Sequence, residues 1–125
     1  MRFAKIVFLV AGIYGLIVLV PQYFFEERTG HDYPPPITHA EYYYGFIGLA
    51  VVWQIFFLIL SRDPVRYRPL MIVAILEKAC FAIPAVILLL QDRIPRLIFG
   101  FARVDAFLGV LFLIAYLKTK EARPS

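Results

Sequence analysis

Residues 70–90 read LMIVAILEKACFAIPAVILLL, and this stretch decides the fold class of the chain. Its charged residues are Glu77 and Lys78, and every other position except Pro84 is aliphatic, aromatic or sulfur-containing. A helix needs about 20 mostly apolar residues to cross the hydrocarbon core of a bilayer. The stretch therefore predicts a membrane-spanning helix over residues 70–90.

Three further apolar runs of similar length flank this stretch, over residues 6–25, 42–60 and 97–117. Pro21 is expected to end or kink the first helix, because proline removes a helical hydrogen bond. Short polar turns separate the last three runs, and short turns make successive helices antiparallel. We therefore expect an all-α integral membrane protein, a four-helix bundle of up-down-up-down order that forms one transmembrane domain over residues 1–125.

The composition of the whole chain agrees with a membrane protein. Of 125 residues, 62% are hydrophobic and 18% are charged, whereas soluble domains have about 45–50% apolar and about 25% charged residues. The net charge of +4 comes from basic residues that flank the apolar runs. Such placement is typical of topology signals and contacts to lipid headgroups. We expect the lipid bilayer to surround the chain and expect no nucleic-acid partner.

The basic residues are distributed unequally between the two ends of the predicted helices. One side receives Arg2, Lys5, Arg62, Arg66, Arg68, Lys118, Lys120 and Arg123, and the other receives Arg28, Arg93 and Arg96. The positive-inside rule assigns the richer side to the cytoplasm. We therefore expect both termini in the cytoplasm, and a multi-pass protein of the cell inner membrane.

The connection over residues 26–40, EERTGHDYPPPITHA, is polar and contains three consecutive prolines. Consecutive prolines favour extended polyproline geometry, so this connection is predicted to be non-helical. Possible metal ligands lie in or next to it, namely His31, Asp32, His39 and Glu41. Their spacing matches no zinc signature, so we expect no metal and no cofactor.

Polar residues inside the apolar runs are the main candidates for a functional site, because such residues usually face a bundle interior or a cavity. At about 1.5 Å per residue, three polar residues from the first three helices fall about 10–13 Å from the cytoplasmic boundary, and one from the fourth helix falls somewhat deeper. We predict that these four line a shared interior: Tyr14, Gln54, Glu77 and Asp105. Small residues that permit close helix approach accompany them, namely Gly12, Gly15, Gly45, Gly48 and Gly109.

Two basic residues complete the set of candidate ligand-binding residues. Lys78 lies about 100° from Glu77 around the helix, a direction from which it can neutralise an acid on a neighbouring helix or subunit. Arg103 and Asp105 are two positions apart and do not face each other. Arg103 lies close enough to the outer boundary for its side chain to extend to the headgroups.

The predicted polar interior has more than one interpretation. It is either a buried network that fixes helix packing, or a pocket or proton path built on carboxylates. Enzyme signatures such as GxSxG, HExxH and the P-loop are absent, so no catalytic residue is assigned. The leading hypothesis is a non-enzymatic protein that binds a lipophilic small molecule or a membrane partner. The alternatives are a small isomerase or oxidoreductase-accessory enzyme that uses Glu77 or Asp105 as acid or base, and a proton-coupled transporter subunit working as a homo-oligomer.

The segments HAEYYYGFIGLAVVWQIFFLILSRDPVRYRPLMIVAILEKACF and RVDAFLGVLFLIAYL resemble those of small four-helix bacterial inner-membrane proteins. The turn over residues 62–69 and the step Leu76-Glu77-Lys78 carry most of this resemblance. In overall plan the chain is similar to the DoxX-like proteins and, more distantly, to the sterol-binding emopamil-binding-protein (EXPERA) superfamily. The resemblance implies a four-helix fold and a lipophilic pocket that contains acidic residues.

Overall fold

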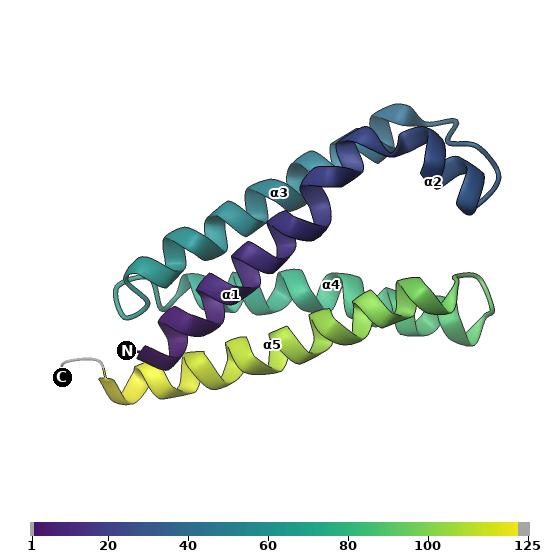
Figure 1. Cartoon of the computed structure of the whole chain (residues 1–125). Coiled ribbons are helices and arrows are strands. Elements are labelled where there is room, and N and C mark those ends of the chain that lie inside the picture. The colour runs from purple at the N-terminus through teal and green to yellow at the C-terminus, as the bar shows by residue number, and fades with distance from the viewer. Residues whose placement is uncertain (1, 123–125) are drawn as a thin grey trace. The chain divides into compact units, whose positions relative to one another are not determined.

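The computed structural model describes residues 2–122, and the side chains of residues 2–120. The topology count from the sequence included Arg123, which lies outside the described residues. Within the described range the helices are joined by turns and irregular connections and there is no strand, which confirms the all-α class. The elements, shown in Figure 1, are α1 (Arg2–Leu19), the 3-10 helix η1 (Val20–Phe24), α2 (Glu26–Asp32), α3 (Ala40–Arg62), α4 (Leu70–Leu90) and α5 (Arg96–Ala122).

Four helical segments of the described chain are long and apolar enough to cross a membrane, judged by length and composition. Their bounds are Arg2–Phe24, Ala40–Arg62, Leu70–Leu90 and Arg96–Lys120. The structure therefore confirms four helical segments of membrane-spanning length and composition, and with them the prediction of a multi-pass chain. The up-down order of the bundle and the cytoplasmic position of both termini stay predictions.

The chain divides into two compact units, which are described separately. One unit combines Met1–Phe8 with Leu60–Ser125 and is called the α4–α5 unit below. The other, Leu9–Ile59, is called the α1–α3 unit. The prediction of a single transmembrane domain stays a prediction.

The α4–α5 unit is a helical hairpin whose two helices run antiparallel, side by side (Figure 1). Its tight turn begins where α4 ends, with Asp92 in the left-handed region at φ 55°. The Arg93 amide donates to the Leu88 carbonyl at 2.8 Å, and the Asp92 amide donates to the Leu89 carbonyl at 2.9 Å. This pair of bonds is a Schellman motif, which satisfies the last carbonyls of a helix and reverses the chain.

Arg68 fixes the opposite end of the hairpin. Its side chain is buried, its Nε donates to the Tyr116 carbonyl at 3.0 Å, and its guanidinium carbon lies 3.8 Å from the centre of the Tyr116 ring. The first turns of α1 pack on the same helix, where the Phe8 and Phe112 rings stack 4.4 Å apart. The sequence analysis counted Arg68 only among the basic residues that indicate topology. The structure shows that Arg68 also joins the 62–69 turn to α5.

In the α1–α3 unit, two glycines let α1 approach α3 closely. A Cβ atom at Gly12 would lie 2.9 Å from the Gln54 carbonyl oxygen and 2.7 Å from Leu58 Cδ2. A Cβ atom at Gly15 would overlap the side chain of Gln54. These two positions confirm the predicted role of small residues, while Gly45 faces open space.

The connection after α1 differs in part from the sequence prediction. As expected, the α-helix ends just before Pro21, and the chain continues as the 3-10 helix η1. The prediction of a non-helical 26–40 segment was wrong for Glu26–Asp32, which form α2. Prolines 34–36 restrict only the residues beside them, and the two acidic residues of the first turn of α2, Glu26 and Glu27, favour the positive end of its dipole.

We predict that Gly12→Ala lowers the unfolding free energy of the purified protein by about 1–3 kcal/mol, the usual effect of overpacking. The reason is that the added methyl group meets backbone of α3, which cannot rotate away as a side chain can. The measurement is unfolding in mixed micelles with increasing denaturing detergent. Gly45→Ala is the matched control and should leave stability unchanged or slightly raised, since alanine is the better helix former. Equal stability of both variants would contradict the close α1–α3 contact.

Candidate functional site

The centre of the α4–α5 unit is an ion-pair cluster formed by three of the predicted site residues. Lys78 on α4 is only 4% exposed. Its Nζ lies 3.3 Å from Asp105 Oδ1 on α5, to which it donates a hydrogen bond, and 3.5 Å from Glu77 Oε2 on its own helix. The prediction that Lys78 can neutralise an acid on a neighbouring helix is confirmed.

Gly109 leaves room for the Lys78 side chain to extend from α4 to Asp105 on α5. It lies one turn after Asp105 on α5, and a Cβ atom there would be 3.3 Å from Lys78 Cβ. A larger residue at this position would push the stem of Lys78 away from α5. The i, i+4 spacing of Asp105 and Gly109 is the sequence signal for this arrangement, because such residues share one face of a helix.

The cluster contains two carboxylates and one ammonium group. Both carboxylates are largely buried, with 17% of the Glu77 side chain and 19% of the Asp105 side chain exposed. Glu77 Oε2 is buried and, apart from its ion pair with Lys78, accepts no hydrogen bond from the described residues. With all three groups ionised, the cluster has one formal negative charge in excess and one acceptor oxygen without a hydrogen bond.

An open groove of about 300 Å³ lies beside the cluster, between α4 and α5. Its walls are apolar and its two charged lining residues are Lys78 and Asp105. The other lining residues are Ile75, Ala79, Ala82, Ile83, Ala106, Gly109, Val110 and Leu113. Because several of these residues are small, the groove is hollowed toward the ion pair instead of being filled by side chains.

The remaining predicted site residues lie elsewhere. Tyr14 and Gln54 belong to the α1–α3 unit, where Tyr14 is half-buried and Gln54 is 3% exposed. Gln54 Nε2 donates to the Ala50 carbonyl at 2.9 Å. Arg103 is exposed on α5 and forms no ion pair with a described residue. The interior shared by Tyr14, Gln54, Glu77 and Asp105 therefore stays a prediction.

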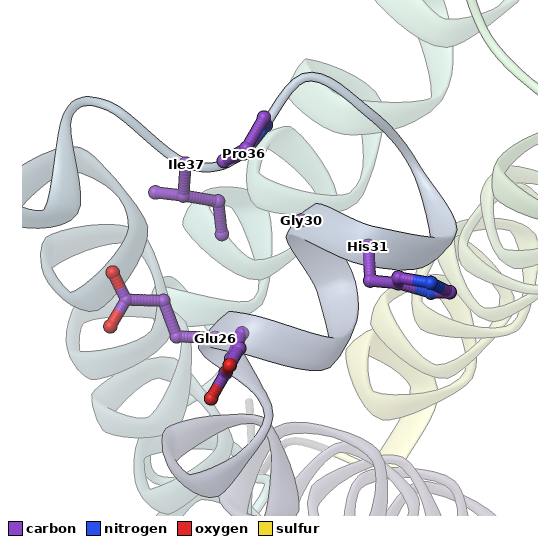
Figure 2. Close-up of a pocket in the computed structure, with 6 residues that line it drawn as sticks. Glu26, Gly30, His31, Pro36 and Ile37 are labelled. Carbon is purple, nitrogen blue, oxygen red and sulfur yellow. The ribbon is translucent and has the colours of Figure 1, made fainter.

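A second hollow, of about 540 Å³, lies in the α1–α3 unit under the proline-rich connection (Figure 2). The chain at Pro36 passes so close to α2 that a Cβ atom at Gly30 would lie 3.0 Å from Pro36 Cα. The Tyr44 hydroxyl donates to Glu26 Oε2 at 2.9 Å and so ties α2 to α3. Among the described residues, no three His, Cys, Asp or Glu side chains converge as a metal site would require.

Comparison of the chain with models of protein families, with curated proteins and with solved structures found no match. The resemblance to the DoxX-like and emopamil-binding proteins therefore stays a prediction. The function of the cluster and the groove is argued below from their own geometry.

We predict that Lys78→Met lowers the unfolding free energy by about 3–5 kcal/mol, because it leaves two buried carboxylates without a cation. Asp105→Asn should have a smaller effect, because Lys78 keeps its ion pair with Glu77 and the amide oxygen can still accept a hydrogen bond. Unfolding of the full-length protein in mixed micelles measures both changes. A loss for Asp105→Asn as large as that for Lys78→Met would contradict the central place of Lys78.

Proposed function

We propose that the chain is an accessory, non-enzymatic membrane protein that binds a lipophilic partner within the bilayer, in the groove between α4 and α5. The observation that carries this proposal is the buried Lys78–Asp105 pair in the lining of an otherwise apolar groove. Binding sites for lipophilic molecules typically combine apolar walls with a few placed polar groups. The apolar walls supply affinity, and the pair supplies a polar contact that selects among partners.

The shape of the groove supports binding over a purely structural role for the ion pair. The side chains of α4 and α5 leave a hollow beside the ion pair, whereas the stacked Phe8 and Phe112 rings fill the contact between α1 and α5 in the same unit. Ala79 and Ala106 are the small residues of this hollow, while the space at Gly109 is occupied by the stem of Lys78. Small residues of this kind also allow a helix to approach closely in a membrane.

The volume of the groove limits what it can hold. At about 300 Å³ it equals the smallest pockets that bind drug-sized molecules, which range from about 300 to 1,000 Å³. Its open side suits the edge of a larger lipophilic body, either a small molecule that projects into lipid or an apolar helix.

The proposed topology places the turn over residues 63–69 and both termini in the cytoplasm, with the bacterial inner membrane as the host membrane. The excess of basic residues at that end supports this orientation. The connection with α2 and its acidic residues then lies on the outer side.

The enzyme and transporter alternatives predict different effects of replacing the carboxylates Glu77 and Asp105. An acid–base role for Glu77 or Asp105 requires that Glu77→Gln or Asp105→Asn abolish turnover while a bound molecule is retained. A proton path requires pH-dependent flux in vesicles that is lost in Asp105→Asn.

We predict that native mass spectrometry of protein purified gently from its own membrane shows a bound lipophilic mass, either a small molecule or a protein chain. Ala79→Leu adds a larger apolar side chain to the groove lining and keeps all three charged residues, and it should reduce this bound fraction about tenfold, as the loss of about 1.4 kcal/mol would. Gly45→Leu adds the same side chain on α3, where Gly45 faces open space, and should keep the wild-type spectrum.

Two results would contradict the proposal. One is a wild-type protein that carries no bound mass after extraction in the mildest detergents. The other is a bound mass that Ala79→Leu leaves unchanged, which would place the binding surface away from the groove.

A further inference from the structure

Arg103 is an exposed cation within a helix of membrane-spanning length. It lies about 10 Å along α5 from Arg96, at about 1.5 Å per residue, and its side chain faces away from the packed side of the hairpin. Ionised residues at such depth usually pair with one another or face a protein interior. The Arg103 side chain can extend to the headgroups from this depth, and an acidic group on a neighbouring chain is the alternative partner for its charge.

The ion-pair cluster has the complementary charge. It contains two carboxylates, Glu77 and Asp105, against the single ammonium group of Lys78, and Asp105 is the acid that lines the open groove. Arg103 cannot reach Asp105 of its own chain directly, because the two residues lie about 200° apart around α5. With all three groups ionised, one copy of the chain therefore has a cation on one surface and one negative charge in excess in the cluster beside its groove.

In two copies inserted in the same orientation, Arg103 of one copy lies at nearly the same depth in the membrane as Asp105 of the other. Arg103 and Asp105 are two positions apart on one helix, which is about 3 Å along its axis. Any second copy inserted in the same orientation therefore presents its Arg103 at the level of Asp105 of the first. Next to Arg103 on the helix surface lies Phe107, which is 63% exposed and provides an apolar side chain for the groove.

We propose that the partner bound in the groove is α5 of a second copy of this chain, with Arg103 of that copy paired to Asp105 beside Lys78. This inference rests on the proposed function, because it requires the groove to bind a partner, and it names that partner. The small residues Ala79 and Ala106 in the lining of the groove allow the incoming helix to approach closely. The two surfaces in contact differ, so the contact is heterologous and repeats from copy to copy into a closed ring or an open array.

The test uses two full-length variants that each lack one of the two surfaces. Arg103→Glu removes the cation and keeps the groove, while Ala79→Leu fills the groove and keeps the cation. Wild type in lipid nanodiscs or mild detergent should be oligomeric by native mass spectrometry. Each variant alone should associate at least roughly thirtyfold more weakly, the effect of losing one buried charge pair or its binding surface. Arg96→Glu, with the same charge change at the first residue of α5, should keep the wild-type oligomer.

The decisive sample is the mixture of the two variants with different tags. Each variant supplies the surface that the other lacks, so the mixture should form a one-to-one heterodimer that does not grow further. Cooperative unfolding shows that each variant is folded. If Arg103→Glu or Ala79→Leu fails this check, Arg103→Ala or Ala79→Val takes its place. A monomeric wild type, an oligomer that survives Arg103→Glu, or a mixture that stays monomeric would overturn the inference.

The same samples separate this inference from the proposed function. If Ala79→Leu releases a bound small molecule while Arg103→Glu changes nothing, the groove binds a partner that is not a second copy, and the inference alone fails. If Ala79→Leu releases neither a small molecule nor a protein chain, both fail.

Discussion

The ammonium group of Lys78 lies in the middle of a helix of membrane-spanning length and requires a counter-ion. In this protein the counter-ion lies on α5, and the resulting ion pair determines how α4 and α5 pack. Placing one charge at the centre of a spanning helix costs about 2.5–3.5 kcal/mol. Lys78 meets the requirement by reaching Asp105 at 3.3 Å on the adjacent helix, and Gly109 leaves room for its stem. The Schellman turn at Asp92 and the Arg68–Tyr116 contact hold the two ends of the hairpin, so the pair forms in one register.

The groove is a consequence of the same register. Gly109 lets α4 and α5 approach closely at the Lys78–Asp105 contact, and small residues such as Ala79 and Ala106 lie beside it. The packing that neutralises Lys78 thus leaves an apolar hollow with a carboxylate in its lining. This hollow is the surface at which we propose that a partner binds, with Arg103 of a second copy as the cation beside Asp105.

The features predicted from the sequence are those set by nearby residues. The four apolar runs, the end of the first helix at Pro21 and the direction of Lys78 all depend on local composition or helical period. The helix α2 was missed because three following prolines outweighed the two acidic residues that begin it. The contact of Arg68 joins residues 48 positions apart, and the groove depends on side-chain sizes from two helices. Neither can be deduced without knowing how α4 and α5 face each other.

The most direct test of this account is a solid-state NMR measurement of the dipolar coupling between Lys78 Nζ and the Asp105 side-chain carboxyl carbon, in lipid bilayers. Selective labelling of lysine nitrogen and aspartate carbon makes the pair observable, and Asp105→Asn identifies its signal. The account predicts a measurable through-space coupling, in agreement with the 3.3 Å separation of nitrogen and oxygen. A wild-type spectrum without this coupling would show that Lys78 does not pair with α5, and would remove the basis for both the hairpin register and the groove.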